Sequence, residues 1–179
     1  MTIPLIITVI AADKPGLVEN LARTINQHGG NWLDSRMARM AGQFAGILRV
    51  DIAREQVEPL RNGLQQLSGQ GINIQLAVSG ETDPAPQPPL YLTLVGNDRP
   101  GIVHEVSAIL GRHGINVDQL ETRCEPAPMS SELLFHAHAR LSLLPQTDID
   151  ALRADLESLA DELMVELGSD ADDEQFKKV

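Results

Sequence analysis

The chain carries one segment twice, and this internal repeat limits the folds that it can adopt. Residues 5–31 align with residues 90–116, 85 positions later, and nine of the 27 aligned positions are identical. The identical positions pair Leu5 with Leu90, Thr8 with Thr93, Asp13 with Asp98, Pro15 with Pro100, Gly16 with Gly101, Val18 with Val103, His28 with His113, Gly29 with Gly114 and Asn31 with Asn116. Since domains contain about 50 to 250 residues, this repeat in a chain of 179 residues predicts two small domains.

Hydrophobic periodicity in the first half predicts the order β-α-β-β-α-β. An apolar, β-branched run at 5–10 indicates a central strand, and the sequence DKPG after it indicates a turn into a helix. Strand-like segments at 32–40 and 44–52 flank a short connection that contains glycine, as in a hairpin. A second helix at 57–67 and an alternating strand at 72–78 complete the unit. The apolar residues with helical spacing are Leu17, Val18, Leu21, Ile25, Val57, Leu60, Leu64 and Leu67.

The second half repeats this order from Leu90 onward. Its first helix follows the second turn, its hairpin arms are 115–125 and 132–144, and a short last strand is expected at 164–168. A 3,4,3,4 spacing predicts that its second helix contains Ile149, Leu152, Leu156, Leu159 and Leu163. Alternation in the second hairpin arm predicts that one set faces the helices, Leu133, Phe135, Ala137, Ala139 and Leu141. The set expected to point away is Leu134, His136, His138 and Arg140.

The sequence therefore predicts an α+β protein with two tandem ferredoxin-like βαββαβ domains, each a four-stranded antiparallel sheet with both helices on one face. We expect domains at 1–79 and 90–168, a proline-rich linker at 80–89, and a flexible acidic tail at 169–179. The helix-free face of each sheet could lie in solvent or pack on another sheet. Pairing within the chain and pairing in a homodimer are both open.

Composition argues against several classes of function. A net charge of -11 and an aromatic content of 3% disfavour direct nucleic-acid binding, which needs phosphate-neutralising cations and stacking platforms. The single cysteine, Cys124, excludes an intramolecular disulfide and favours a cytoplasmic location. Residues 1–12 resemble a secretory signal because an apolar run ends in small residues. No Lys or Arg precedes this run, so a buried strand is expected instead. No stretch is long enough for a membrane span, so we expect no membrane partner.

The repeated turn before the first helix of each half has two explanations. Asp, Pro and Gly form turns, an Asp can cap a helix, and the repeated His-Gly-x-Asn can end it. Alternatively, the unpaired N–H groups and positive dipole end of a helix N-terminus attract a carboxylate. Asp13 or Asp98 could then accept the ammonium group of the same ligand. An amino acid carries both charges and would satisfy such a site.

Other candidate chemistry is weaker. His136 and His138 share one strand face, but no third metal ligand accompanies them, so no metal site is expected. Cys124 has acidic sequence neighbours that would raise its pKa and suppress its reactivity. Ser130 and Ser131 lie in a hairpin connection without the context of a nucleophile. Because no phosphate-binding or dinucleotide motif is present either, the sequence predicts no cofactor and no enzymatic activity.

The segments DKPGLVENLARTINQHGGNWLDSRM and NDRPGIVHEVSAILGRHGINVDQLETR resemble the signature of ACT domains, small ferredoxin-like modules that bind amino acids and regulate metabolism. Within that family, the length, the proline-rich linker and the segment NWLDSRMARMAGQF resemble the glycine cleavage system transcriptional repressors. This resemblance implies a regulator that senses a small amino acid of the glycine or serine class and acts on a LysR-type activator. Two alternatives are a module related to the N-terminal part of formyltetrahydrofolate deformylase and an adaptor that binds no ligand.

The resemblance also implies where the ligand binds. ACT domains commonly hold an amino acid at an interface between two domains, between the turn before the first helix and the Asn that opens the second strand. The corresponding positions are Asp13, Lys14, Gly16 and Asn31 in the first half, and Asp98, Arg99, Gly101 and Asn116 in the second. The polar residue before the motif is Asn97 in the second half but Ala12 in the first, which favours the second half as the occupied site.

Overall fold

The computed structural model contains two compact units, Met1–Asp83 and Pro84–Val179. It describes residues 1–78, 88–128, 132–144, 146–159 and 163–168. Most of the predicted linker, the serines of the second hairpin connection and the whole predicted tail lie outside these residues. No helix in the described ranges is long and apolar enough to span a membrane.

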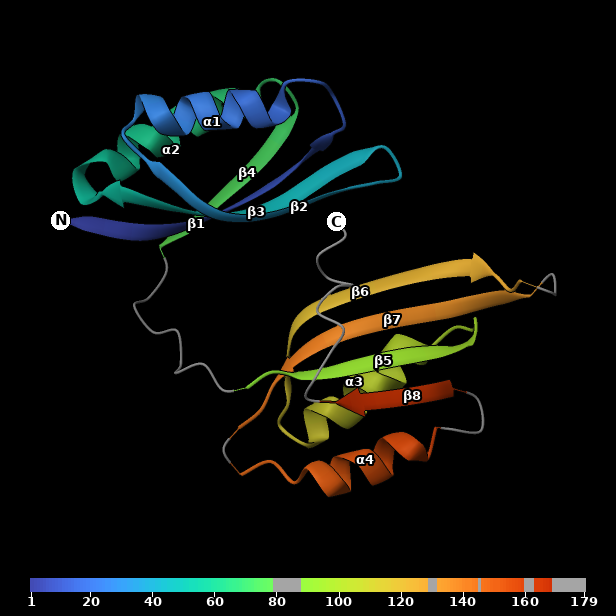
Figure 1. Cartoon of the computed structure of the whole chain (residues 1–179). Coiled ribbons are helices and arrows are strands. Elements are labelled where there is room, and N and C mark those ends of the chain that lie inside the picture. Colours follow the sequence, from blue (N-terminus) through green and yellow to red (C-terminus); the bar gives the residue numbers. More distant parts are fainter. Residues whose placement is uncertain (79–87, 129–131, 145, 160–162, 169–179) are drawn as a thin grey trace. The chain divides into compact units, whose positions relative to one another are not determined.

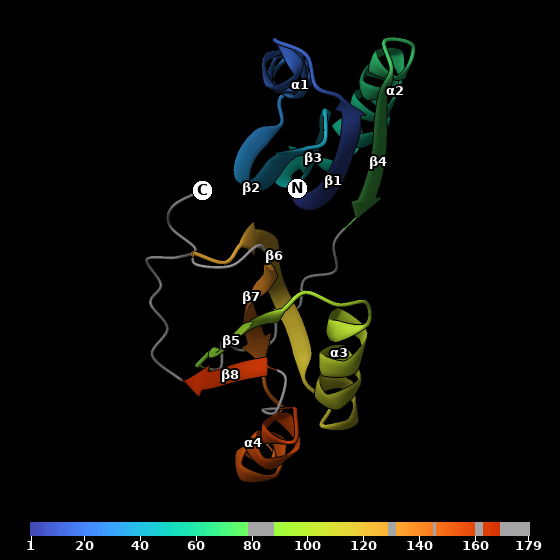
Figure 2. The ribbon, with the colours of Figure 1, turned by 90° about the vertical axis from the view of Figure 1, so that its right-hand side faces the viewer.

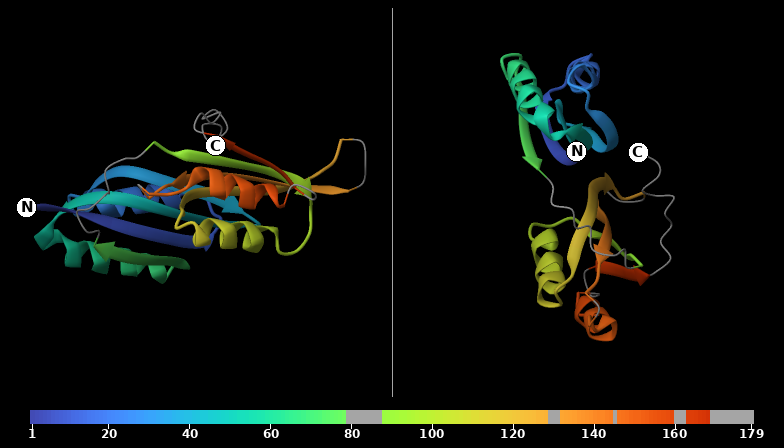
Figure 3. Two further views of the ribbon diagram at one scale, coloured as in Figure 1. Left: turned by 90° about the horizontal axis from the view of Figure 1, so that it is seen from below. Right: turned by 90° about the vertical axis from the view of Figure 1, so that its left-hand side faces the viewer.

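The first unit is a four-stranded antiparallel sheet with the strand order β2-β3-β1-β4 and two helices on one face (Figure 1). Its elements are β1 (Thr2–Ala12), α1 (Leu17–Gln27), β2 (Asn31–Met40), β3 (Gln43–Ala53), the 3-10 turn η1 (Arg54–Gln56), α2 (Val57–Ser68) and β4 (Ile72–Val78). Figure 3 shows α1 and α2 side by side over the sheet. The first twelve residues thus supply a central strand, as the sequence predicted.

The second unit repeats this topology with the strand order β6-β7-β5-β8 (Figure 2). Its elements are β5 (Leu90–Asn97), α3 (Ile102–Arg112), β6 (Asn116–Pro126), β7 (Leu133–Ser142), α4 (Ile149–Glu157) and β8 (Leu163–Gly168). Both β5 and its counterpart β1 lie in the interior of their sheets, where they pair with strands on each side. The predicted tandem of ferredoxin-like βαββαβ folds is confirmed.

Each unit has its own core between the helices and the covered face of its sheet. In the first unit, alternate residues of β1 are buried together with the inner faces of α1 and α2. In the second, the inner residues of β5 and β7 pack against α3 and α4 in the same way. The largest fully buried side chains include Leu5, Ile7, Leu21, Leu60, Leu92, Leu141 and Leu152. Burying an aliphatic side chain contributes roughly 1.5 to 3 kcal/mol, so these two layers account for much of the stabilisation.

The hairpin between β2 and β3 turns within two residues. Ala41 and Gly42 have φ values of 48° and 79°, so both central positions are left-handed. This is the backbone of a tight hairpin turn whose twist matches that of the flanking strands. Its position confirms the predicted connection around Gly42.

One prediction about the second unit was wrong. The helix α4 ends at Glu157, so Leu159 and Leu163 lie outside it, and Leu163 is instead the first residue of β8. Both leucines still contact the core, which is why the apolar periodicity continued past the helix end. Leu133 alternates in phase with the buried residues of β7, and it is 49% exposed because it lies at the open end of the strand. The other four residues of its set are buried as predicted.

Candidate functional site

The two repeated turns adopt the same backbone conformation. Gly16 and Gly101 precede α1 and α3 with φ values of 87° and 101°, in the left-handed region that side chains disfavour. The carbonyl of each glycine accepts the first helical hydrogen bond, from Asn20 and Glu105 respectively, at 2.9 Å. Neither helix has a side-chain cap. Backbone N–H groups of both first turns are therefore available to an anion.

The aspartates of the turns do not cap the helices, which corrects one of the two explanations drawn from the sequence. Asp13 forms an ion pair with Arg39 at 2.7 Å, and its backbone N–H donates to the Gly42 carbonyl at 2.9 Å. Both partners lie at the β2–β3 hairpin. Asp13 therefore ties the first turn to the end of its sheet, and its carboxylate already has a cation.

The cation of the first turn has no such partner. Lys14 forms no ion pair within the described part of the chain, and it follows Asp13 directly at the start of the turn. Its ammonium group is a compact charge on a flexible stem. The first turn thus presents an available positive charge next to an uncapped helix N-terminus.

The second turn has the opposite pairing. Arg99 donates from Nη1 and Nη2 to the two carboxylate oxygens of Glu105, at 2.8 and 2.7 Å. These hydrogen bonds hold the pKa of Glu105 below its usual value, against partial desolvation that acts in the other direction. The guanidinium of Arg99 is therefore engaged with a carboxylate of the same unit.

Asp98 lies beside a thiol instead of a cation. Its backbone N–H donates to the Leu133 carbonyl at 2.8 Å, which ties this turn to the start of β7. The exposed Cys124 of β6 has a raised pKa, mainly from partial desolvation and then from the charge and hydrogen bond of Asp98. The predicted direction of this shift is right, but the sequence neighbours do not cause it. Asn97 ends β5 and is exposed, opposite Leu134.

The asparagines expected to share the ligand lie at the other end of each unit. Asn116, the first residue of β6, pairs with Ser142 at the end of the sheet where β5 begins. Asn97, next to the turn, lies at the opposite end of the sheet, level with the last residues of β6. In the first unit, Asn31 pairs with Asp51 of β3, which in turn pairs with Pro4 near the start of β1. The helix between turn and asparagine has 11 residues, which corresponds to roughly 16 Å. One unit alone does not bring the predicted contacts together.

The repeated histidines serve the helix layer. His28 follows α1, contacts the Thr24 carbonyl through Nδ1 at 2.8 Å, and packs so closely on α2 that a Cβ on Gly63 would lie 2.7 Å from its ring. His113 follows α3, and its Nε2 lies 2.9 Å from Asp155 of α4. In each unit this histidine joins the two helices, so its repetition has a structural reason.

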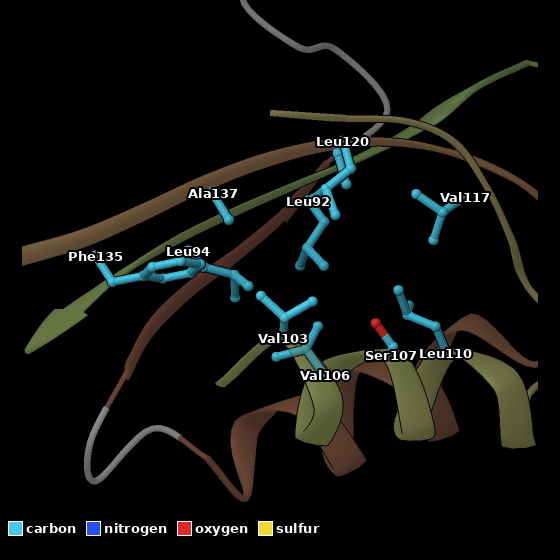
Figure 4. A pocket seen from close by; sticks show the side chains of 11 residues that line it. Leu92, Leu94, Val103, Val106, Ser107, Leu110, Val117, Leu120, Phe135 and Ala137 are labelled. Carbon is cyan, nitrogen blue, oxygen red and sulfur yellow. The ribbon is translucent and has the colours of Figure 1, made fainter. Parts of the chain in front are cut away.

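The second unit contains a small apolar hollow between α3 and the sheet (Figure 4). Its volume is about 30 Å³, and Ser107 is its one hydroxyl-bearing residue. Its lining includes Leu92, Leu94, Val103, Val106, Leu110, Val117, Leu120, Phe135, Ala137 and Ala139. Figure 4 shows Val103 and Val106 pointing from α3 toward the side chains of the sheet.

At two of the positions that line the hollow, the second unit has smaller side chains than the first unit has at the matching positions. Strand register places Val117 where the first unit has Trp32, and Ala139 where it has Leu48. Trp32 packs against the first core, and Leu48 is fully buried there. Val103 and Leu120 of the lining are 44% and 47% exposed, so the hollow is partly open to solvent.

Two histidines, His136 and His138, lie on one strand of the second sheet. Thr93 Oγ1 lies 3.2 Å from His138 Nδ1. The pKa of His138 is lowered by desolvation first, and then by the charges of Arg123 and His136. Among the residues that the structure describes, no three potential ligands gather to hold a metal ion.

Both halves of the chain match models of a known domain family. Residues 4–77 and 90–161 each match a model of the ACT domain. The chain belongs to the ACT-domain family. Both matches lie within the two units described above and include the repeated turns.

Individual relatives extend this likeness over the tandem. The glycine cleavage system transcriptional repressor of Escherichia coli is 26% identical over 169 residues, covering 92% of this chain and 86% of the relative. A solved structure of an unknown protein from Galdieria sulphuraria has a TM-score of 0.81 and 25% identity, covering 93% of this chain and 98% of that one. Another, provisionally assigned as a glycine cleavage system transcriptional repressor, has a TM-score of 0.68, 18% identity, and coverage of 94% and 97%. The similarity to the Escherichia coli transcriptional repressor thus spans both ACT domains.

Proposed function

We propose that this protein is an amino-acid sensor that binds glycine at its ACT turns and thereby changes its hold on a LysR-type activator of the glycine cleavage genes. It acts in the cytoplasm by protein contact and does not touch nucleic acid. The observation that carries the proposal is the repeated turn, in which a left-handed glycine and an uncapped helix N-terminus lie next to side chains of both charges. The similarity to the Escherichia coli repressor over most of both chains supports the regulatory target.

The ligand site needs parts from more than one domain. Because the turn and the asparagine lie at opposite ends of each unit, an amino acid held by Asp98 and Gly101 is out of reach of Asn116 in the same unit. We propose that a second copy of the chain supplies the missing contact, so that the active form is a homodimer. Sedimentation velocity with and without glycine measures this, and a strictly monomeric chain that still binds glycine would exclude it.

Isothermal titration calorimetry tests the sensor. Glycine, serine and alanine are titrated into the intact chain and into four variants, Asp13→Ala, Asn31→Ala, Asp98→Ala and Asn116→Ala. Loss of glycine binding in at least one turn variant and in its matching asparagine variant is expected. Glu157→Gln, an exposed residue on α4, serves as a charge-matched control. If none of the three amino acids binds the folded chain, the sensor hypothesis is wrong and a ligand-free adaptor remains.

Coupling to the partner requires a second measurement. A ligand shifts binding to a partner only by its differential affinity for the free and bound states, and the effect is reciprocal. Binding of the purified activator is therefore measured with and without glycine, and glycine binding is measured with and without activator. Equal affinities in all four conditions would separate ligand binding from regulation.

A further inference from the structure

Arg99, the cation of the second turn, already binds a carboxylate at the place where the carboxylate of a ligand would bind. Glu105 is the fourth residue of α3, and both of its oxygens accept hydrogen bonds from Arg99, at 2.8 and 2.7 Å. One oxygen would lie 3.3 Å from a Cβ added to Gly101, so the carboxylate lies over the start of the helix. There it interacts favourably with the guanidinium and with the positive end of the helix dipole.

The first turn lacks this internal anion. At the position of Glu105 it has Asn20, a neutral residue whose carboxamide oxygen accepts a hydrogen bond from Arg23. Glu19 also lies in the first turn of α1, but it pairs with Arg23 at 3.0 Å. Lys14, the counterpart of Arg99, has no ion pair within the described ranges. The two turns share a backbone and differ in whether their cation is occupied.

We propose that Glu105 is a built-in competitor for the ligand's carboxylate, a specificity-determining residue that weakens amino-acid binding at the second turn and directs the ligand to the first. The inference rests on the proposed function, because it requires an amino acid that binds at these turns. A ligand entering the second turn must replace one carboxylate–guanidinium pair with another, so its net gain is small. This reverses the preference for the second half that Asn97 and Ala12 suggested.

The test exchanges the two residues that differ. Glycine is titrated calorimetrically into the wild-type chain, Glu105→Gln, Asn20→Glu and the control Glu157→Gln. Glu105→Gln is expected to tighten binding at the second turn by roughly 1.5-fold to fivefold, the range for losing a competing ion pair of this exposure. Asn20→Glu gives Lys14 a carboxylate and is expected to weaken binding at the first turn by a similar factor. Glu157→Gln removes the same charge at the end of α4 and is expected to leave the affinities of both turns for glycine unchanged.

Amide resonances assign each affinity to a turn. In ¹⁵N-labelled protein, backbone signals of Leu17 and Val18 report on the first turn, and those of Ile102 and Val103 report on the second. In the wild-type chain, glycine is expected to shift the first pair at lower concentration than the second. Glu105→Gln should move the second pair to lower concentration and leave the first pair as it was.

The outcomes separate this inference from the proposed function. If glycine binds neither the wild-type chain nor any variant, and the spectra show folded protein, the proposed function fails. If glycine binds but Glu105→Gln behaves like Glu157→Gln, or if the second turn fills first in the wild-type chain, the inference is overturned and the sensor remains. Tightening confined to the second turn supports both.

Discussion

The two repeated turns have one backbone and two opposite arrangements of charge. In the first, the acidic member is neutralised by Asp13–Arg39 and the cation of Lys14 is available. In the second, the basic member is neutralised by Arg99–Glu105, and the acidic member forms no ion pair with any residue that the structure describes. A repeat can thus keep the geometry of a binding element while changing which ligand charge it accepts. Equal sequence motifs do not imply equal sites.

The two cores differ in a similar way. Trp32 and Leu48 pack in the first core, while the smaller Val117 and Ala139 line a hollow at the matching place in the second. Protein interiors are packed closely enough that a difference of a few methyl groups affects stability. Exchanging residues between the units therefore tests whether the contrast in packing is real.

The largest expected effect comes from changing the size of one matching pair of core residues, Leu48 and Ala139. Leu48→Ala opens a cavity in the filled core and should cost the first unit about 3 kcal/mol. Ala139→Val adds two methyl groups beside the hollow and should change the stability of the second unit by less than about 1 kcal/mol. Urea unfolding, monitored by hydrogen exchange in each unit, measures the change in stability of both variants. A loss in the second unit equal to that in the first would show that the hollow is not usable space.

A close approach in the first sheet gives the next largest effect. A Cβ added to Gly46 would lie 2.5 Å from Met37 Cγ and 3.0 Å from the Arg36 carbonyl, so Gly46→Ala should destabilise by about 2 kcal/mol. The second unit has Ala137 opposite Thr122 at these positions. Adding Met37→Thr to Gly46→Ala should therefore restore much of the loss in thermal denaturation. If the double variant is no better than the single one, the backbone carbonyl is the decisive obstacle.

The turns themselves should both respond, since their conformation is the same, with the larger loss at Gly101, where an added Cβ would also lie 3.3 Å from Glu105. Gly16→Ala and Gly101→Ala each place a side chain in the left-handed region and should cost about 1 kcal/mol. Gly111→Ala is the matched control, because this position is helical with no atom near an added Cβ, and it should stabilise α3. Chemical denaturation of all three variants checks the prediction. A tolerant Gly101 beside a sensitive Gly16 would mean that the second turn relaxes readily.

Sequence alone was sufficient for the fold because the hydrophobic pattern is strong and occurs twice. The alternation of apolar residues in β1 and their helical spacing in α1 each define a single apolar face. The order of the elements and the type of sheet follow from these faces. The pattern failed at Leu163, which continues the helical spacing of α4 across a chain reversal into β8. Periodicity reports which residues are buried, and both a helix and the strand after it can bury leucines.

The candidate site was only partly predictable. The glycine turns are visible in the sequence because their conformation requires glycine. The ion pairs are not, since Arg39 meets Asp13 across a hairpin and Glu105 meets Arg99 six residues away, which is no helical spacing. The hollow is equally hidden, because it depends on the combined size of residues from three strands and a helix.

The smallest expected effect is a pH dependence confined to the second unit. Desolvation, followed by the charges of Arg123 and His136, lowers the pKa of His138 in the folded state, and Glu121 opposes this. The unfolded chain therefore binds a proton at this residue more readily than the folded one. As the pH falls through about 6.5, the usual pKa of histidine, protonation favours unfolding, and the loss levels off below the folded pKa.

Replacing the histidine isolates this contribution. The urea midpoint of the second unit is measured at pH 7.5 and pH 5 for the wild-type chain and for His138→Gln, which retains a hydrogen-bonding group near Thr93. The variant should lose less stability on acidification than the wild-type chain, because it has no proton to take up at this position. Since carboxylates also titrate in this range, the difference between the two proteins, and not the total change, carries the information. A difference of opposite sign would mean that Glu121 dominates and that the folded face prefers the charged imidazole.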